Sequence, residues 1–158
     1  MSTPSPAPIL RKELDLRVHG TSTDATNRSA WPALHLAAFA GDETRVRELL
    51  AGGVGVDQRS VHEGGCIGAT ALHCAAVIGA APVVALLIRA GADLQARDEA
   101  GYTALHIAAE RGDTAVVKLL VKGGAEVRAE IGDTSPLALA RRGRHIAAAG
   151  LLKQVGAR

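Results

Sequence analysis

The sequence predicts an all-α solenoid in which four short helix-turn-helix repeats stack side by side, with extended fingers between them. The motif Thr-Ala-Leu-His occurs at residues 70–73 and again 33 positions later, at residues 103–106. Self-similarity at a fixed period of this length is the signature of stacked repeats. The chain also has one Trp, one Tyr and one Phe among 158 residues. Its core must therefore be built from smaller aliphatic side chains, which suits thin layers of closely packed helices.

The two motif copies are followed by the same pattern of glycines and paired aliphatic residues. Gly79 and Gly112 each stand nine positions after the motif threonine, and Gly91 and Gly124 close the two units. Apolar residues at helical spacing precede and follow the first glycine of each unit. The apolar residues that follow the glycine form a second stripe, which consists of Val83, Val84, Leu86 and Leu87 in one copy and of Val116, Val117, Leu119 and Leu120 in the other. One helix pair cannot bury both stripes alone, so the units must stack.

Two looser copies flank this pair. The first contains Leu34 and the fourth contains Leu137 at the position of the motif leucine. Leu34 lies 38 positions before Leu72, so the first connecting loop carries about five extra residues relative to the usual period. Leu105 lies 32 positions before Leu137, which indicates a deletion of one residue.

Taken together, these four copies resemble the ankyrin repeat family, whose 33-residue unit is a β-turn followed by two helices with a Thr-Pro-Leu-His motif. The resemblance covers roughly residues 27–155 and implies an ankyrin-type solenoid with β-turn fingers. Departures are visible at Ala71 and Ala104, which replace the motif proline, and at Ala138, which replaces the histidine. The resemblance also implies that His35, His73 and His106 are structural, each bonding to the backbone of a neighbouring turn.

The motif residues have clear local roles. Thr70 and Thr103 are expected to cap the first helix of their repeats by accepting from free N–H groups. Pro136 falls at a first helical position, where its missing N–H group costs nothing. Gly79 and Gly112 are expected to end the first helix and turn the chain.

The two ends of the chain are less regular. Residues 1–29 are expected to form a disordered tail and an N-terminal capping segment, and residues 30–158 the repeat domain. Within the first part, residues 9–18 fit either a short helix or a strand. At the other end, Ile146, Ala147 and Gly150 occupy surface positions of the last repeat. A terminal repeat should present a polar outer face, so this cap is weak.

Composition and charge exclude several classes of function. The formal charge is +2, with acidic and basic residues interspersed, whereas a nucleic-acid binder concentrates uncompensated Lys and Arg on one face. Two cysteines argue against a disulfide framework. No apolar run approaches the length of a transmembrane helix, and the proline-rich start lacks the parts of a secretory signal. We therefore expect a cytoplasmic, monomeric protein without nucleic-acid or membrane partners.

No residue pattern predicts catalysis. His62, Cys66, His73 and Cys74 can be drawn as a metal set, but their spacing is irregular. The helical pattern places Cys74 on a buried face, where a free cysteine behaves as a small hydrophobe. The glycine pairs at residues 52–53 and 64–65 match no phosphate-binding loop. We expect no enzyme activity, no cofactor and no bound metal.

The resemblance implies that partners bind a concave face made by finger tips and by the exposed end of each first helix. Carried over position by position, the predicted partner-binding residues are Trp31, Phe39, Val77, Ile78, Tyr102, Glu110, Arg111 and Arg141. All three aromatic residues fall in this set, and exposed aromatics are enriched at interface hot spots. The alternative is that Trp31 packs on residues 9–18 and that Phe39 belongs partly to the core.

The predicted function is that of an interaction module, or scaffold, that binds another protein across this face. An alternative is a dedicated inhibitor or immunity-type protein that occludes one enzyme or toxin. The face is expected to be apolar in the first two repeats and basic in the last two. The extended loop at residues 59–68 fits either an addition to the binding side or a tolerated surface insertion.

Overall fold

The computed structural model describes residues 31–61 and 67–156. Within these residues the chain forms eight helices, and the only strand-like pairing is an isolated bridge between Ile131 and Thr134. The helices form four pairs: α2 (Ala33–Ala40) with α3 (Glu43–Ala51), α4 (Ala71–Ile78) with α5 (Ala81–Arg89), α6 (Ala104–Arg111) with α7 (Thr114–Lys122), and α8 (Pro136–Arg142) with α9 (Ile146–Gln154). The predicted all-α solenoid of four helix-turn-helix repeats is confirmed. Residues 1–29, including the expected capping segment at 9–18, lie outside the described residues.

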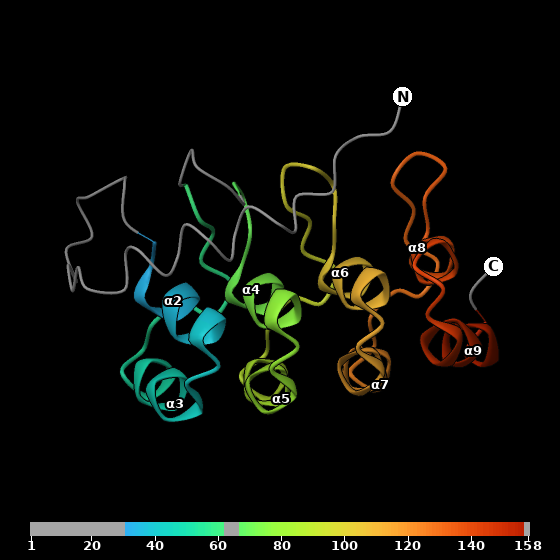
Figure 1. The fold of residues 1–158 in the computed structure, drawn as a ribbon. Helices are drawn as coiled ribbons and strands as arrows, with labels where there is room; N and C mark the ends of the chain where they lie inside the picture. The colour runs from blue at the N-terminus through green and yellow to red at the C-terminus, as the bar shows by residue number, and fades with distance from the viewer. Residues whose placement is uncertain (1–30, 62–66, 157–158) are drawn as a thin grey trace.

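The four pairs stack in two rows (Figure 1). Helices α2, α4, α6 and α8 form one row, which we call the inner row, and α3, α5, α7 and α9 form the outer row. Each helix packs against its own partner and against its neighbours in the same row, so the helices of the first and fourth pairs have one row neighbour and the others have two. No described helix has the length and apolar character needed to cross a membrane.

Helices α6 and α8 begin, and α4 and α6 end, as the sequence predicts. Thr103 caps α6, since its hydroxyl oxygen accepts from the His106 N–H at 3.4 Å. Pro136 is the first residue of α8. At the other end, Gly79 and Gly112 adopt left-handed backbone angles, with φ of 76° and 75°, a conformation that glycine reaches without the steric penalty of a Cβ atom.

The core consists of layers of leucine, valine and alanine. Leu72, Leu105 and Leu137 are almost fully buried, one in each of three successive repeats. Ala76 and Ala109 have no exposed surface and lie between neighbouring inner-row helices. Such small side chains let the helix axes approach closely, which explains how the stack is filled with so few aromatic rings.

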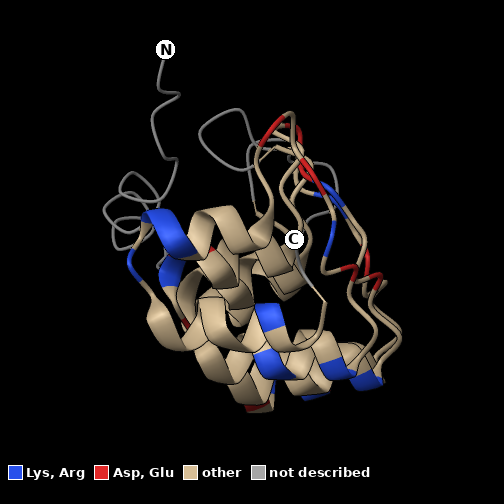
Figure 2. Ribbon diagram, turned by 90° about the vertical axis from the view of Figure 1, so that its right-hand side faces the viewer, with Lys and Arg blue, Asp and Glu red and all other residues tan. Residues whose placement is uncertain are grey.

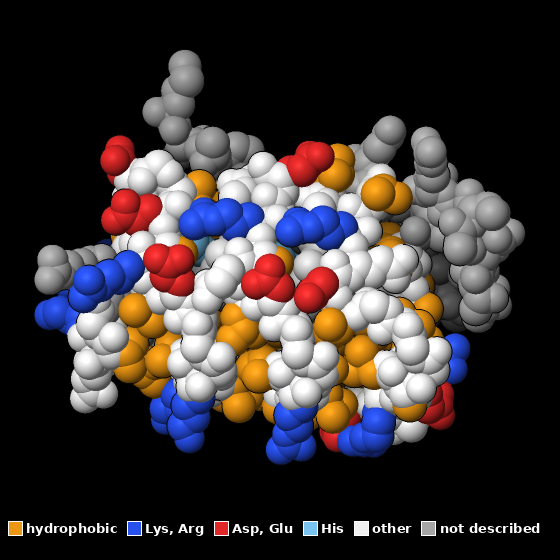
Figure 3. Space-filling model, turned by 180° about the vertical axis from the view of Figure 1, so that it is seen from behind, with side chains coloured by type: hydrophobic (Ala, Val, Ile, Leu, Met, Phe, Trp, Pro, Cys, Tyr) orange, Lys and Arg blue, Asp and Glu red, His pale blue; other side chains and the backbone are white. Residues whose placement is uncertain are grey.

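Arg59 and Arg97, which no sequence pattern marks, link neighbouring fingers by hydrogen bonds. Nη1 of Arg59 donates to the carbonyls of Gly68 at 2.9 Å and Arg97 at 2.6 Å. Nη1 of Arg97 donates in turn to Gly101 at 3.1 Å and to Glu130, in the next finger, at 3.0 Å. Seen from behind, the finger segments carry both basic and acidic side chains, with hydrophobic side chains between them (Figure 3).

Candidate partner-binding face

His35 joins the first repeat to the second, and His73 joins the second to the third. Nε2 of His35 lies 2.8 Å from the Ala69 carbonyl, and Nε2 of His73 lies 2.9 Å from the Tyr102 carbonyl. On the other side of the His73 ring, Nδ1 accepts from the backbone N–H of Thr70 at 3.1 Å. Burial lowers the pKa of His73, because the charged ring would lose its hydration, and the hydrogen bond to Tyr102 only partly opposes this. Both ring nitrogens of His73 are thus engaged, whereas His35 bonds through Nε2 and its buried Nδ1 has no hydrogen-bond partner among the described residues. Both histidines have the structural role that the resemblance implied.

His106 departs from this pattern. Its Nδ1 lies 2.8 Å from the Thr103 hydroxyl, but its Nε2 is buried and has no hydrogen-bond partner among the described residues. The finger that follows is one residue shorter, because its turn closes from Ile131 to Thr134, whereas the preceding one closes from Asp98 to Tyr102. The one-residue deletion therefore lies in this finger.

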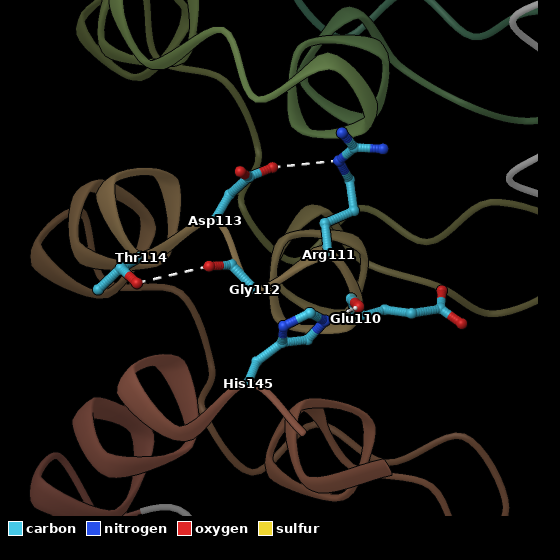
Figure 4. A network of polar contacts seen from close by, with 6 residues as sticks. All are labelled: Glu110, Arg111, Gly112, Asp113, Thr114 and His145. Atoms are coloured by element: carbon cyan, nitrogen blue, oxygen red, sulfur yellow. Dashed lines mark hydrogen bonds and ion pairs between the residues drawn. The ribbon is translucent and has the colours of Figure 1, made fainter. Parts of the chain in front are cut away.

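His145 makes the corresponding junction between the third and fourth repeats through a different position. Its Nε2 lies 2.9 Å from the Glu110 carbonyl, at the end of α6. The ring covers the turn at Gly112, where a Cβ atom would collide with it (Figure 4). These contacts give His145 a structural role at the junction.

The two finger aromatics are held edge-on by buried histidines. The ring centroids of Trp31 and His35 are 6.0 Å apart at an interplanar angle of 65°, and those of Tyr102 and His106 are 5.9 Å apart at 67°. Edge-to-face pairs of this kind fix ring orientation. Both Trp31 and Tyr102 are half-buried, so each presents only part of its ring to solvent.

The predicted helix-end residues occur together along the inner row. Phe39 lies near the end of α2, Val77 and Ile78 end α4, and Glu110 and Arg111 end α6. Because these helices are neighbours, the five residues follow one edge of the stack. We call the apolar candidate residues, Trp31, Phe39, Val77, Ile78 and Tyr102, the apolar strip; Trp31 and Tyr102 belong to the segments that precede α2 and α6.

The strip is less exposed than expected. All five of its residues are half-buried, and Trp31 and Phe39 pack against the core. The alternative that Phe39 belongs partly to the core is therefore supported. Packing of Trp31 on residues 9–18 concerns a segment outside the described residues.

The charged part of the edge is largely neutralised, rather than basic as expected. Nε of Arg111 lies 3.1 Å from Oδ2 of Asp113, and Nη2 of Arg142 lies 3.7 Å from Oε1 of Glu110 (the first pair is drawn in Figure 4). Burial raises the pKa of Tyr102, and the negative charge of Glu110 adds to this shift. The acidic partners thus offset the positive charge that the sequence suggested for the last two repeats.

Arg141 lies elsewhere. It lines the open end of the stack beside α9, and Arg142 occupies the place next to Glu110. In the sequence, Arg141 stands two positions before Gly143, as Val77 stands before Gly79 and Glu110 before Gly112, and this spacing led to its place among the candidates. The register differs by one residue in the structure. The left-handed turn position is held instead by Arg144, with φ of 59°.

Nothing in the described part of the chain forms a metal centre: no group of three or more His, Cys, Asp or Glu side chains is placed to hold an ion. Of the four residues considered from the sequence, His62 and Cys66 lie outside the described residues. His73 has both ring nitrogens engaged, and Cys74 is a buried free thiol.

Stacked helix pairs, turn-forming fingers and histidines that link neighbouring repeats define the chain as a repeat solenoid. A family model described as ankyrin repeats (three copies) matches residues 10–98 and 79–158. The chain belongs to the ankyrin repeat family. A search among curated proteins finds no match.

Proposed function

We propose that this chain binds a partner protein through the apolar strip. Ankyrin repeats are generally protein–protein interaction modules. The observation that carries the proposal is the state of Tyr102: its ring is half-exposed and held edge-on to His106. Tyr102 stands just before α6, and Val77 and Ile78 end the neighbouring helix α4. Rigid aromatic side chains lose little conformational entropy on binding and are enriched at hot spots.

The charged residues of the edge, Glu110, Arg111 and Arg142, contribute less to the proposed binding than the apolar strip. Because Glu110 and Arg142 already pair with each other, they contribute a polar border more than a positive field. Affinity then comes mainly from apolar contact at the strip, with Arg111 at its rim. The partner is expected to present apolar side chains there.

The test begins with capture of the partner by the full chain from its own host, followed by binding measurements on variants. Tyr102→Ala and Phe39→Ala are each expected to weaken binding by about 1–4 kcal/mol. Lys118→Ala serves as a control, because this exposed residue lies on the outer row, in α7. Urea melts of each variant separate binding from folding.

The proposal fails if the aromatic variants that remain folded bind as tightly as the unaltered chain. The same complex distinguishes the two modes of action. A partner enzyme or toxin that loses its activity when bound indicates a dedicated inhibitor, whereas a partner that stays active indicates a scaffold. Sedimentation of the free chain tests the proposed monomer, and fractionation of host cells tests a cytoplasmic location.

A further inference from the structure

The open end of the stack carries a groove that the strip does not include. It lies on the outward side of α8 and α9, has a volume of about 490 Å³, and is bordered by the cations Arg141, Arg144 and Lys153. Its apolar part is formed by Ile146, Ala149 and Gly150. We call this surface the end groove.

The end groove is not the surface that an internal repeat offers to its neighbour. Counted from the residue that caps each inner-row helix, Arg141 stands where earlier repeats have the fully buried Ala76 and Ala109. By the same count, Lys153 stands where the third repeat has Val121. Another repeat stacked here in the usual way would bury two cations without partners, at a high cost in desolvation.

The end groove is not an ordinary polar cap either. Ile146 is 87% exposed, more than any other large hydrophobic side chain among the described residues. The equivalent residue of the third repeat is Thr114. An isoleucine this exposed on the end of a solenoid indicates apolar contact with something else, since polar outer faces keep terminal repeats soluble.

The backbone at Arg144 adds an independent observation. Arg144 adopts φ of 59°, in the left-handed region, where the three preceding repeats have Gly41, Gly79 and Gly112 at the equivalent position. A non-glycine residue in this region is strained, and such strain concentrates at functional sites. The fourth repeat thus accepts backbone strain at the place where a guanidinium group borders the groove.

The three cations of the groove are not neutralised within the described chain. Arg141, Arg144 and Lys153 form no ion pair with any described residue, and no acidic side chain lines the groove. Viewed from this end, Asp and Glu lie mainly along the fingers (Figure 2). Charge complementarity therefore favours an acidic occupant, and it disfavours a second copy facing the first end to end.

We propose that the end groove binds a short acidic segment of a partner protein, with apolar side chains between its carboxylates. The apolar side chains pack on Ile146 and Ala149. The carboxylates pair with Arg141 and Arg144, whose planar guanidinium groups suit two-point pairing with carboxylate, and with Lys153.

The probe is a fluorescent 12-residue peptide of glutamates with leucines at helical spacing, titrated with the full chain. Two matched peptides replace either all glutamates by glutamine or all leucines by serine. The acidic leucine peptide is expected to bind at least 10-fold more tightly than either, and to weaken as salt rises, because exposed ion pairs are screened. Equal binding of the glutamine peptide would overturn the proposal.

Arg144→Gly gives the sharpest variant. It removes the cation and relieves the left-handed strain, so the Tm is expected to rise while peptide binding falls at least 5-fold. A merely structural Arg144 would not separate the two measurements. Arg141→Glu is expected to weaken binding at least 10-fold, whereas the outer-row control Lys118→Glu, on α7, should change it less than 2-fold.

Two further results complete the test. Tyr102→Ala should leave peptide binding unchanged, so failure at the end groove is distinguishable from failure at the apolar strip. Sedimentation over a range of chain concentrations examines self-association through the groove. Dimers that Arg144→Gly dissociates, together with no peptide binding, would show that the occupant is a second copy and would refute the acidic-segment proposal.

Discussion

The third repeat, packed between two neighbours, and the fourth, packed on one side only, share some motif positions and differ at others. Leu105 and Leu137 are both buried, and both inner-row helices start at a capping side chain, Thr103 in α6 and Ser135 in α8. The differences fall elsewhere. His106, Ala109, Gly112, Val117 and Val121 become Ala138, Arg141, Arg144, Ala149 and Lys153 in the fourth repeat.

These differences separate two kinds of motif residue. The shared residues serve the helix pair itself, by capping α8 or filling the space between α8 and α9. Of the changed residues, Ala109 and Val117 are fully buried in the third repeat, which is covered on both sides, whereas Arg141 and Ala149 line the end groove. The irregular fourth copy is therefore not a decayed repeat. It keeps what its own folding requires and changes what a following repeat would require.

The largest effect should distinguish burial on two sides from burial on one. Leu105→Ala is expected to lower the free energy of unfolding by about 2–5 kcal/mol, because the cavity lies between two neighbouring repeats that hold it open. Leu137→Ala is expected at the lower end of this range, since α8 has a neighbour on one side only and can relax into the space. Urea melts of both variants make the comparison. A loss under about half a kcal/mol at Leu105 would contradict the repeat register.

Acidification should lower the stability of the first three repeats through their motif histidines. The fourth repeat has Ala138 in place of this histidine, so it has no such group to protonate. Burial lowers the pKa of His106 to about 4, below the 6.5 of an exposed histidine, and the pKa values of His35 and His73 are lowered too. A folded-state pKa below the unfolded value gives stability that is complete above about pH 6.5 and is lost as the pH falls toward 4.

For His106 alone, this linkage amounts to about 2 kcal/mol between pH 8 and pH 5. The measurement is a series of urea melts across this range on the unaltered chain and on His106→Gln, which has no group to titrate at this site. The variant should show a smaller loss on acidification. Equal slopes in the two proteins would mean that the pKa of His106 is the same in the folded and unfolded states.

Much of this fold could be predicted from the sequence because the repeat period fixes local structure. The caps, the turn glycines Gly79 and Gly112 and the proline at the start of α8 all follow from backbone preferences that act within a few residues. The fingers could not be predicted in the same way. Arg59 and Arg97 are bonded to carbonyls of other segments, and no pattern in the sequence marks a guanidinium group that will reach them.

The candidate site was predicted less well, for two physical reasons. A glycine is the usual signal for a left-handed turn, so the spacing assigns Arg141, two residues before Gly143, to the position that Glu110 has in the third repeat. The structure instead has Arg144 in the turn and Arg142 beside Glu110. The exposed fraction of a side chain also depends on its neighbours in space. The period places Phe39 at the edge of the stack, but only the packing shows that the core covers part of it.

The smallest effect concerns how the fourth repeat is attached to the third. Two contacts reach Glu110 from this repeat: the ring of His145 meets its carbonyl at 2.9 Å, and Arg142 meets its carboxylate at 3.7 Å. The Arg142 side chain is 67% exposed, so water screens the ion pair, and Arg142→Ala is expected to cost about 0.2–1 kcal/mol. Removal of the partly buried His145 bond should cost about 0.5–1.5 kcal/mol, and more if the Glu110 carbonyl is left unsatisfied. Urea melts of Arg142→Ala and of His145→Ala at low and high salt give the comparison. Since screening acts on the ion pair and hardly on the hydrogen bond, only the Arg142 effect should shrink with salt. An Arg142 effect that equals or exceeds that of His145 would mean that charge, and not the buried ring, holds the last repeat in place.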